Sequence, residues 1–417
     1  MNFLRNYKTV ISNFGFLSIL NVLDLGLPIV IIPFITQVIG NENFGIYIYV
    51  LLWAQNINLL TQYGFQFSAA KRISQNRDDL QYISRLSSNV LAARFLMASI
   101  LVALALILSP VVFDSPGSLF MFITSLGIVF GDVFIPTWLF QGMERMKYVT
   151  IANATTKCLF ALFVIIFIRR TEDYVYILAL NSVGFLFSAL LSMILARKQF
   201  GLILVKPQLK DILVELKDGF PLFGSTVGIN LYRNLNVIIL HFFVSDAAVG
   251  VYGLAEKVIK ACQALIMPIS QALFPHVSLK IKQEGLTKSL QLIRNASLII
   301  VILAIVGCFC LWLFGDILVA IVGDDFYEAL PLMYLMYPVI LFGSLNFLLG
   351  FVGLINMGKQ KQFFYSVFLS GTLALLFILI SANHLGVDSA AIAMSLSEIV
   401  LTILCLYHLF MVKNNAR

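Results

Sequence analysis

Twelve apolar runs of membrane length divide this chain from end to end. A helix needs about 20 apolar residues to cross the hydrocarbon core of a bilayer, and it satisfies its own backbone hydrogen bonds there. A membrane β-barrel would instead show segments of about ten residues in which apolar and polar side chains alternate. We therefore predict an all-α polytopic membrane protein with about twelve transmembrane helices. The runs cover residues 12–38, 44–66, 88–109, 118–140, 148–168, 175–195, 220–244, 251–275, 292–314, 331–356, 363–383 and 390–411.

Composition excludes several other classes of protein. Of the 417 residues, 60% are hydrophobic and only 12% are charged, which is more apolar surface than a water-soluble fold buries. The net charge of +7 comes from bases scattered among short loops, so we expect no nucleic-acid partner. The first apolar run has no small-residue cleavage site, so we expect an anchor and not a signal peptide. The five cysteines lie in apolar runs without metal-ligand spacing, so we expect neither a metal nor another cofactor.

The loop charges sort onto two sides of the predicted membrane. Because twelve is an even number, both termini share a side. The loops on that side hold 21 Lys and Arg, whereas the loops on the opposite side hold only Arg169 and Arg170. Cytoplasmic loops carry such an excess of basic residues. We therefore predict that both termini are cytoplasmic.

An inner loop near the middle divides the chain into two halves. We predict a six-helix lobe at 1–195, a cytoplasmic linker at 196–219 and a second six-helix lobe at 220–417. Within the linker, four apolar residues recur at helical spacing, which predicts an amphipathic helix lying in the membrane interface. These residues are Leu209, Ile212, Leu213 and Leu216.

The first helix of each half is followed by a similar segment. The sequence IGNENFGIYIYV at 39–50 resembles VSDAAVGVYGLA at 244–255, with Gly45 matching Gly250 and Tyr47 matching Tyr252. Such a match predicts a parallel repeat, in which two six-helix halves are related by an axis normal to the membrane. In transporters of this kind the substrate site lies between the halves.

Four segments resemble Wzx-type polysaccharide flippases. The resemblance spans the chain and places it in the MOP superfamily, beside the MATE exporters and the MurJ-type lipid II flippases. MurJ-like proteins carry two further helices that this chain lacks. The segments are LNVLDLGLPIVIIPFITQVIGNENFGIYIYV at 20–50, YGFQFSAAKRISQNRDD at 63–79, ALFPHVS at 272–278 and GDDFYEALPLMYL at 323–335.

This resemblance implies a function. Members of the family move undecaprenyl-diphosphate-linked oligosaccharides from the cytoplasmic to the outer face of the bacterial inner membrane, for O-antigen or capsule-like polysaccharide. It implies alternating access between two six-helix lobes, coupled to a gradient of H⁺ or Na⁺. Contacts with other polysaccharide-assembly membrane proteins fit the same role, and no catalytic residue is expected.

Nine charged side chains fall inside the predicted spans, apart from Arg294 at the inner end of 292–314, which is counted with the loops. Near a helix centre each costs roughly 2.5–3.5 kcal/mol on insertion scales, so most must face water or one another. The basic ones are Arg94, Lys157, Arg233, Lys257 and Lys260, and the acidic ones are Asp24, Asp132, Glu256 and Glu398.

The basic residues predict a site for a diphosphate and its sugars. Arg233 shares a helix face with Asn230 and Asn234, at spacings of three and four residues. Arginine grips a phosphate through two parallel N–H bonds, lysine supplies a point charge, and amides bond to hydroxyls. We expect a wet, basic cavity along 220–275, with Arg233 as its principal residue. The remaining candidates are Lys260, Lys257, Lys157 and Arg94, although snorkelling to the interface would also account for Arg94 and Lys257.

The four acids are candidates for ion coupling or for charge pairing. A buried carboxylate that binds a proton on one side of the membrane and releases it on the other couples transport to a gradient. The alternative is a fixed salt bridge. Glu256 precedes Lys260 by one helical turn in the favourable order, so pairing is the simpler interpretation there.

Two other functional classes compete with a flippase. A MATE-like multidrug or cation antiporter takes organic cations, which a cavity lined by Arg233 and Lys260 would repel. A membrane glycosyltransferase or polymerase would need a nucleotide fingerprint, a metal cluster or a large outer loop. The sequence contains none of these, so we expect no enzyme.

Overall fold

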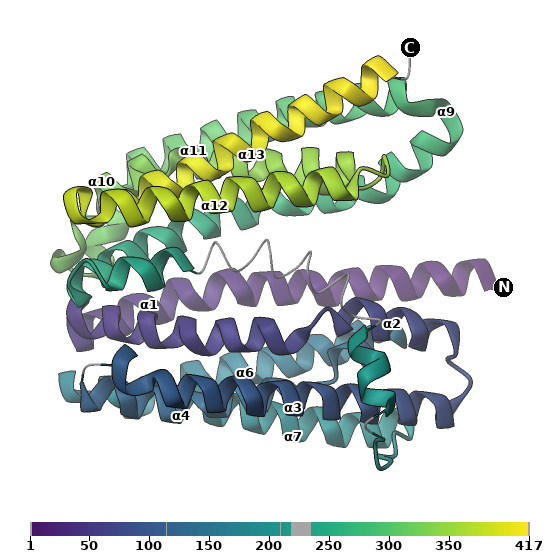
Figure 1. Cartoon of the computed structure of the whole chain (residues 1–417), viewed down its shortest axis with the longest axis horizontal. Helices are drawn as coiled ribbons and strands as arrows, with labels where there is room; N and C mark the ends of the chain where they lie inside the picture. Colours follow the sequence, from purple (N-terminus) through teal and green to yellow (C-terminus); the bar gives the residue numbers. More distant parts are fainter. Residues whose placement is uncertain (1, 114, 209, 218–234, 416–417) are drawn as a thin grey trace. The chain divides into compact units, whose positions relative to one another are not determined.

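Helices make up every regular element of the described chain (Figure 1). The computed structural model describes residues 2–113, 115–208, 210–217 and 235–415, with the backbone alone for 2–25 and a few further helical positions. Among these residues, nine helical stretches are long and apolar enough to cross a membrane. The predicted all-α membrane fold is therefore confirmed, while the side on which the termini lie stays a prediction.

The helices overlap the predicted spans, and several extend beyond the apolar run into polar residues. In the first half they are α1 (Asn2–Gln62), α2 (Phe65–Gln75), α3 (Leu80–Val112), α4 (Pro116–Val133), α5 (Thr137–Gly142), α6 (Met146–Phe167), η1 (Thr171–Tyr176) and α7 (Ile177–Phe200). In the second half they are α9 (Asp246–Val322), η2 (Asp324–Phe326), α10 (Ala329–Leu335), α11 (Tyr337–Asn346), η3 (Phe347–Leu354), α12 (Gln360–Leu385) and α13 (Asp388–Asn415). The seventh predicted span, 220–244, lies outside the described residues except for a helix at 235–241.

Two of the helices, α1 and α9, each contain two predicted spans. Gly40 interrupts α1 with φ 78° and ψ 174°, and Gly285 interrupts α9 with φ 83° and ψ 178°. Only glycine adopts these angles readily, because a Cβ would clash with the backbone. Each glycine therefore ends one helical segment and starts the next.

The chain forms two compact units. Unit 1 comprises Met1–Gly40 and Ile46–Val227, and unit 2 comprises Asn41–Gly45 and Gly228–Arg417. In unit 1, α7 packs against both α4 and α6. Two serines of α7 bond to backbone carbonyls of those helices: Ser182 Oγ donates to Thr124 O at 2.6 Å and Ser188 Oγ to Ala152 O at 2.7 Å. Small hydroxyl residues let membrane helices approach closely and hydrogen-bond, so these contacts tie the bundle together.

The predicted interfacial helix packs against protein. The helix at 210–217 places Ile212, 8% exposed, in the core formed by α2 and α5, and Leu216 packs against the same core. Leu213 is 58% exposed, so the predicted apolar stripe is split between a protein-facing and an outward side. The buried Glu215 explains the difference, because its carboxylate lies 2.7 Å from Nη1 of Arg72 on α2. Leu209 lies outside the described residues.

In unit 2, the two matched glycines of the predicted repeat lie against each other. A Cβ on Gly45 would overlap the carbonyl of Asp246, and a Cβ on Gly250 would overlap the carbonyl of Asn41. The backbones therefore touch where the repeated segments begin, and the matched Tyr252 is fully buried beside them. This close approach requires glycine at both positions.

Candidate functional site

A buried ion pair lies inside unit 1. Arg94, from the middle of α3, is 2% exposed, and its Nη2 lies 2.6 Å from Oδ2 of Asp132 in the last turn of α4. Arg94 Nη1 also donates to the carbonyl of Val133 at 3.3 Å. Burial and pairing show that Arg94 does not snorkel to the interface. The pair also satisfies the expectation that charges within the spans face one another.

An aromatic ring covers the arginine. The chain leaves α4 at Val133, and Pro136 precedes the short helix α5, whose second residue is Trp138. The guanidinium carbon of Arg94 lies 5.3 Å from the centre of the Trp138 ring, within the range of a cation–π contact. Trp138 is itself 1% exposed. The break between α4 and α5 therefore places the indole where it shields the charge from lipid.

A polar cavity of about 250 Å³ adjoins this pair. Four of its lining side chains are neutral amides, which offer both donors and acceptors. Two further donors in its wall, Nε of Arg94 and Nε1 of Trp138, are buried without a hydrogen-bond acceptor among the described residues. The arrangement suits a ligand rich in oxygen. The lining residues are Gln62, Gln66, Arg94, Asp132, Thr137, Trp138, Gln141, Val149 and Asn153.

Charge alone did not identify this cavity in the sequence. The prediction named Arg94 and Asp132 but not that they are partners, and it passed over Gln62, Gln66 and Gln141. A detectable signal was present, because Gln62 and Gln66 are four residues apart near the end of an apolar run. An uncharged amide near a helix end costs little free energy of membrane insertion, so its presence does not indicate a functional site as an intramembrane charge does.

Lys157 is not among the described residues that line the cavity. Lys157 lies on α6, one turn after Asn153, which does line it. Lys157 is half-buried and has an interaction with other residues of the chain. Asp24 falls on α1, and its side chain lies outside the described residues. Their predicted roles stay predictions.

In unit 2, the predicted pairing of Glu256 and Lys260 is present. Nζ of Lys260 lies 2.8 Å from Oε1 of Glu256, which is 6% exposed. Lys257 is half-buried on the same stretch of α9. Arg233, Asn230 and Asn234 lie outside the described residues. Of the residues predicted to form a basic cavity along 220–275, only those on α9 are therefore described, and the cavity stays a prediction.

A second polar network of unit 2 surrounds Glu398 on α13. This carboxylate is 1% exposed and accepts a hydrogen bond from Asn346 Nδ2 at 2.7 Å. The hydroxyl of Thr402 donates to Asn346 Oδ1 at 2.7 Å. Asn346 immediately precedes η3, an eight-residue π-helix, and π-helices occur frequently at functional sites. The side chain of Asn346 therefore connects Glu398 with Thr402.

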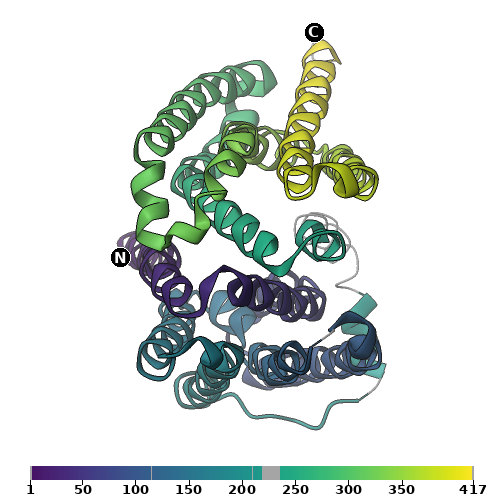
Figure 2. The same ribbon diagram turned by 90° about the vertical axis from the view of Figure 1, so that its left-hand side faces the viewer.

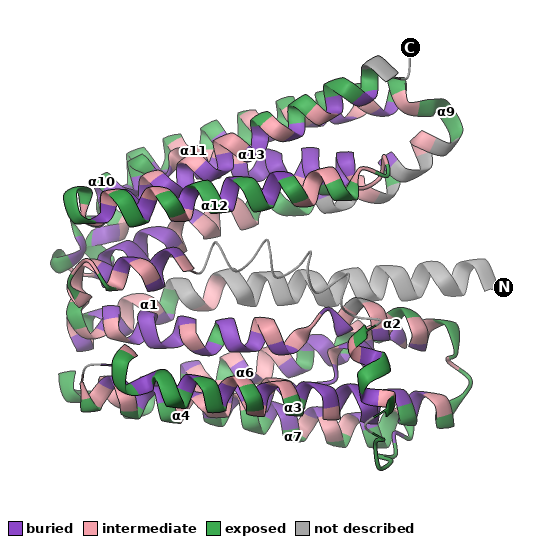
Figure 3. Ribbon diagram, viewed as in Figure 1, coloured by how far each residue is buried: buried purple, intermediate pink, exposed green. Residues whose placement is uncertain are grey.

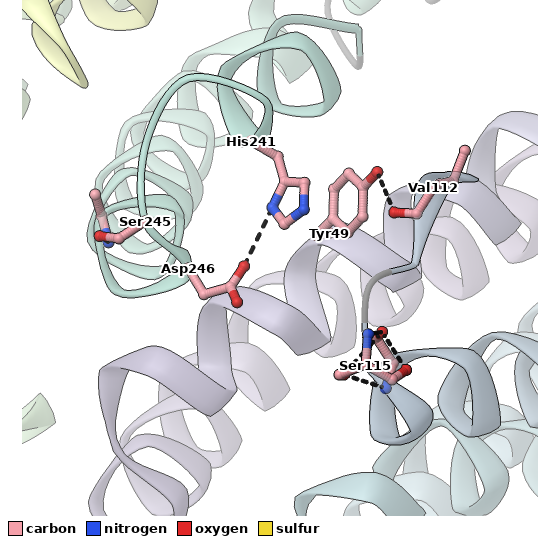
Figure 4. Close-up of polar contacts among 8 residues, drawn as sticks. Tyr49, Val112, Ser115, His241, Ser245 and Asp246 are labelled. Atoms are coloured by element: carbon pink, nitrogen blue, oxygen red, sulfur yellow. Dashed lines mark hydrogen bonds and ion pairs between the residues drawn. The ribbon is translucent and has the colours of Figure 1, made fainter. Parts of the chain in front are cut away.

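At the start of α9, His241 and Asp246 face each other across the turn (Figure 4). Nδ1 of His241 lies 3.2 Å from Oδ1 of Asp246, and the Ser245 hydroxyl accepts from Ala248 N at 3.4 Å. In unit 1 the start of α4 is capped in the same way by Ser115, which accepts from Ser118 N at 3.1 Å. These contacts fix helix ends, so we assign them a structural role.

The chain is similar to two curated bacterial proteins, each named "Putative O-antigen transporter". One, from Shigella dysenteriae, is 30% identical over 258 residues, and the match spans 62% of this chain and 64% of that protein. The other, from Escherichia coli (strain K12), is 24% identical over 411 residues, or 98% of each chain.

Solved structures share the fold. An inward-facing multidrug resistance MATE family transporter of the MOP superfamily superposes with a TM-score of 0.76 at 13% identity, covering 97% of this chain and all of that one. The lipid II flippase MurJ, in an inward closed conformation, superposes with a TM-score of 0.73 at 12% identity, covering 95% of this chain and 87% of that one. A family model described as polysaccharide biosynthesis protein matches residues 10–280, and the chain therefore belongs to the polysaccharide biosynthesis protein family.

Proposed function

We propose that this protein is a flippase that moves undecaprenyl-diphosphate-linked oligosaccharide units from the cytoplasmic to the outer face of the inner membrane. The polar cavity of unit 1 is the observation that carries the proposal. A glycan cannot enter hydrocarbon unless protein groups replace its water, and hydroxyl groups need donors and acceptors together. Four amides beside a buried arginine provide both. The family and the names of the relatives support a role in O-antigen or similar surface polysaccharide.

The diphosphate of the substrate needs positive charge elsewhere. Arg94 is neutralised by Asp132, and Lys260 is held by Glu256, so neither offers an uncommitted charge. We assign the principal phosphate contact to Arg233, with Lys257 and Lys157 as further bases and Asn230 and Asn234 bonding to sugar hydroxyls. Arginine is suited to this role because it can hold two phosphate oxygens at once.

Asp24 and Glu398 are the proposed coupling residues. A buried carboxylate that takes up a proton or a metal cation on one side of the membrane and releases it on the other couples transport to an ion gradient. Glu398 is 1% exposed and is bonded to Asn346, the residue before the π-helix η3, and π-helices occur frequently at functional sites. Transport is coupled to H⁺ or Na⁺ through these acids during alternating access.

Lipid extraction from a deletion strain tests the proposal. Loss of the protein should trap lipid-linked repeat units on the cytoplasmic side, where a membrane-impermeant glycosidase added to spheroplasts does not reach them. Wild-type protein should restore their accessibility, and Arg233→Lys should restore it less than wild type does. Arg233→Ala should restore none while being expressed at wild-type level. Normal surface polysaccharide in the deletion strain would contradict the function.

The same strain separates a flippase from a MATE-like cation antiporter. The antiporter is the second candidate because the fold is shared with a MATE transporter and the unit 1 ion pair leaves that cavity without net charge. A flippase predicts that deletion leaves the minimum inhibitory concentrations of cationic dyes unchanged. A several-fold fall in those values, with normal polysaccharide, would support the antiporter instead.

A further inference from the structure

An apolar groove lies at the end of α7, away from the polar cavity. It has a volume of about 450 Å³, within the range of roughly 300–1,000 Å³ typical of ligand pockets. All of its lining residues belong to unit 1. Five of them are apolar and the sixth is an arginine: Met193, Ile194, Leu202, Ile203, Leu204 and Arg197.

The outer wall of this groove is an extended segment fixed to α3. Figure 2 shows the chain after α7 as a thin, non-helical teal trace. The amide of Ile203 donates to Ser84 Oγ at 3.3 Å, and the amide of Val205 donates to Ser88 Oγ at 2.9 Å. The two serines are one turn apart on α3, so they satisfy alternate amides of an extended chain. Non-helical backbone needs such partners where water is scarce.

The segment turns apolar side chains outward. Leu202 is 3% exposed and anchors the wall, whereas Ile203, Leu204 and Val205 are 66%, 57% and 45% exposed. Three consecutive exposed aliphatic residues outside a helix are unfavourable in water and favourable against acyl chains. Figure 3, which colours residues by burial, shows exposed residues on α7 as well, and these include Leu190 and Ile194.

The chain segment that forms the wall of the groove carries basic residues, and the next acid along the chain is Asp211. From Ala196 to Lys210 the sequence ARKQFGLILVKPQLK contains four bases and no acid. Arg197 lines the groove, Lys198 follows it on α7, and Lys206 comes two residues after Leu204; all three are exposed. Basic pockets on the cytoplasmic side of membrane proteins bind anionic lipid headgroups, because they combine positive charge with access to the bilayer.

We propose that this groove binds an anionic phospholipid of the inner leaflet, with one acyl chain along Met193, Ile194 and Leu204 and the phosphate on Arg197. The bound lipid holds the wall 202–205 against α3. It is a resident lipid and not the transported substrate, since the polar cavity and Arg233 serve that role in the proposed function. Failure of either proposal leaves the other intact.

Thermal unfolding of the full-length protein in detergent tests the binding. Adding dioleoyl-phosphatidylglycerol should raise the midpoint by several degrees more than the same amount of dioleoyl-phosphatidylcholine. Arg197→Ala should lose most of this difference. Arg145→Ala, which removes another exposed arginine outside the groove, should keep it. Equal shifts with the two lipids, or an undiminished difference in Arg197→Ala, would overturn the proposal.

Two further arms separate phospholipid binding from helix stabilisation and from carrier-lipid binding. If Arg197 only stabilised the end of α7, its removal would lower the midpoint equally with both lipids, and the proposal would be wrong. Leu204→Trp fills the groove and keeps every charge, so it should reduce the number of phosphatidylglycerol molecules retained in native mass spectrometry. Displacement of phosphatidylglycerol by equimolar undecaprenyl phosphate would identify the groove as a carrier-lipid site and refute a resident phospholipid.

Discussion

Arg94 and Asp132 meet at 2.6 Å inside unit 1, and the arginine is almost completely shielded from solvent. Removing one partner of such a pair leaves the other charge buried without compensation, which costs about 3–5 kcal/mol. We therefore expect Arg94→Ala and Asp132→Ala each to lower the thermal midpoint of the purified protein strongly.

Replacing both partners should separate stability from transport. Apolar residues of similar volume often replace a buried ion pair without loss of stability. The double variant Arg94→Met with Asp132→Leu should thus unfold close to the wild-type midpoint and yet fail to restore surface polysaccharide in the deletion strain. Full restoration would show that the pair has only a structural role.

Glu398→Gln should uncouple transport while preserving the fold. A glutamine can still accept the hydrogen bond from Asn346, but it cannot bind or release a proton. Translocation by reconstituted protein should lose its dependence on an imposed ion gradient, and the thermal midpoint should change by no more than a few degrees. Asp316→Gln, at an exposed acid of α9, is the control and should behave as wild type. Gradient-driven transport at the wild-type rate in Glu398→Gln would show that another residue couples transport to the ion gradient.

Gly250→Ala should disrupt unit 2. The new Cβ would overlap the carbonyl of Asn41, and backbone cannot move aside as a flexible side chain can. Overpacking of this kind typically costs about 1–3 kcal/mol, measured here as a fall in the thermal midpoint. Gly307→Ala on the same helix is the matched control, since no described atom outside the helix's own backbone lies within 4 Å of the added atom. A wild-type thermal midpoint for Gly250→Ala would show that the backbone around Gly250 can move away from Asn41 without loss of stability.

Glu215→Ala should release the linker helix. Its carboxylate is the partner of Arg72, which also donates from Nε to the Tyr82 hydroxyl at 3.0 Å. Burial lowers the pKa of the Arg72 guanidinium. The hydrogen bonds and charge interactions with Tyr82 and Glu215 outweigh this effect, so the pKa is raised overall. Limited proteolysis should cut the variant within 201–217 faster than wild type. Glu284→Ala, which breaks an exposed pair with Lys288, is the control and should leave the cleavage rate unchanged.

The sequence predicted most of the helices because their signal is local. Apolar length located the described membrane helices, although Leu80–Val112 begins eight residues before the predicted span 88–109 and Gln283–Val322 begins nine residues before 292–314. A spacing of four residues was enough to pair Glu256 with Lys260. The pairs Arg94–Asp132 and Arg72–Glu215 were not predicted, since their partners are 38 and 143 residues apart. Nothing local distinguishes an arginine that will meet an acid from one that will snorkel.

The linker helix shows a second reason why some contacts were not predicted. A stripe of apolar residues does not say which of them protein will cover. Ile212 and Leu216 pack against protein, whereas Leu213 is 58% exposed. That this exposed side lies in the membrane interface stays a prediction.

The breaks at Gly40 and Gly285 depend on handedness and not on contacts with other parts of the protein. Apart from the neighbouring backbone, no described atom lies within 4 Å of where a Cβ would stand at either residue. Their φ and ψ are close to the mirror image of an ordinary extended residue. A D-alanine introduced by chemical ligation should therefore fit where L-alanine strains the chain. The two long helices α1 and α9 turn where the sequence supplies an achiral residue.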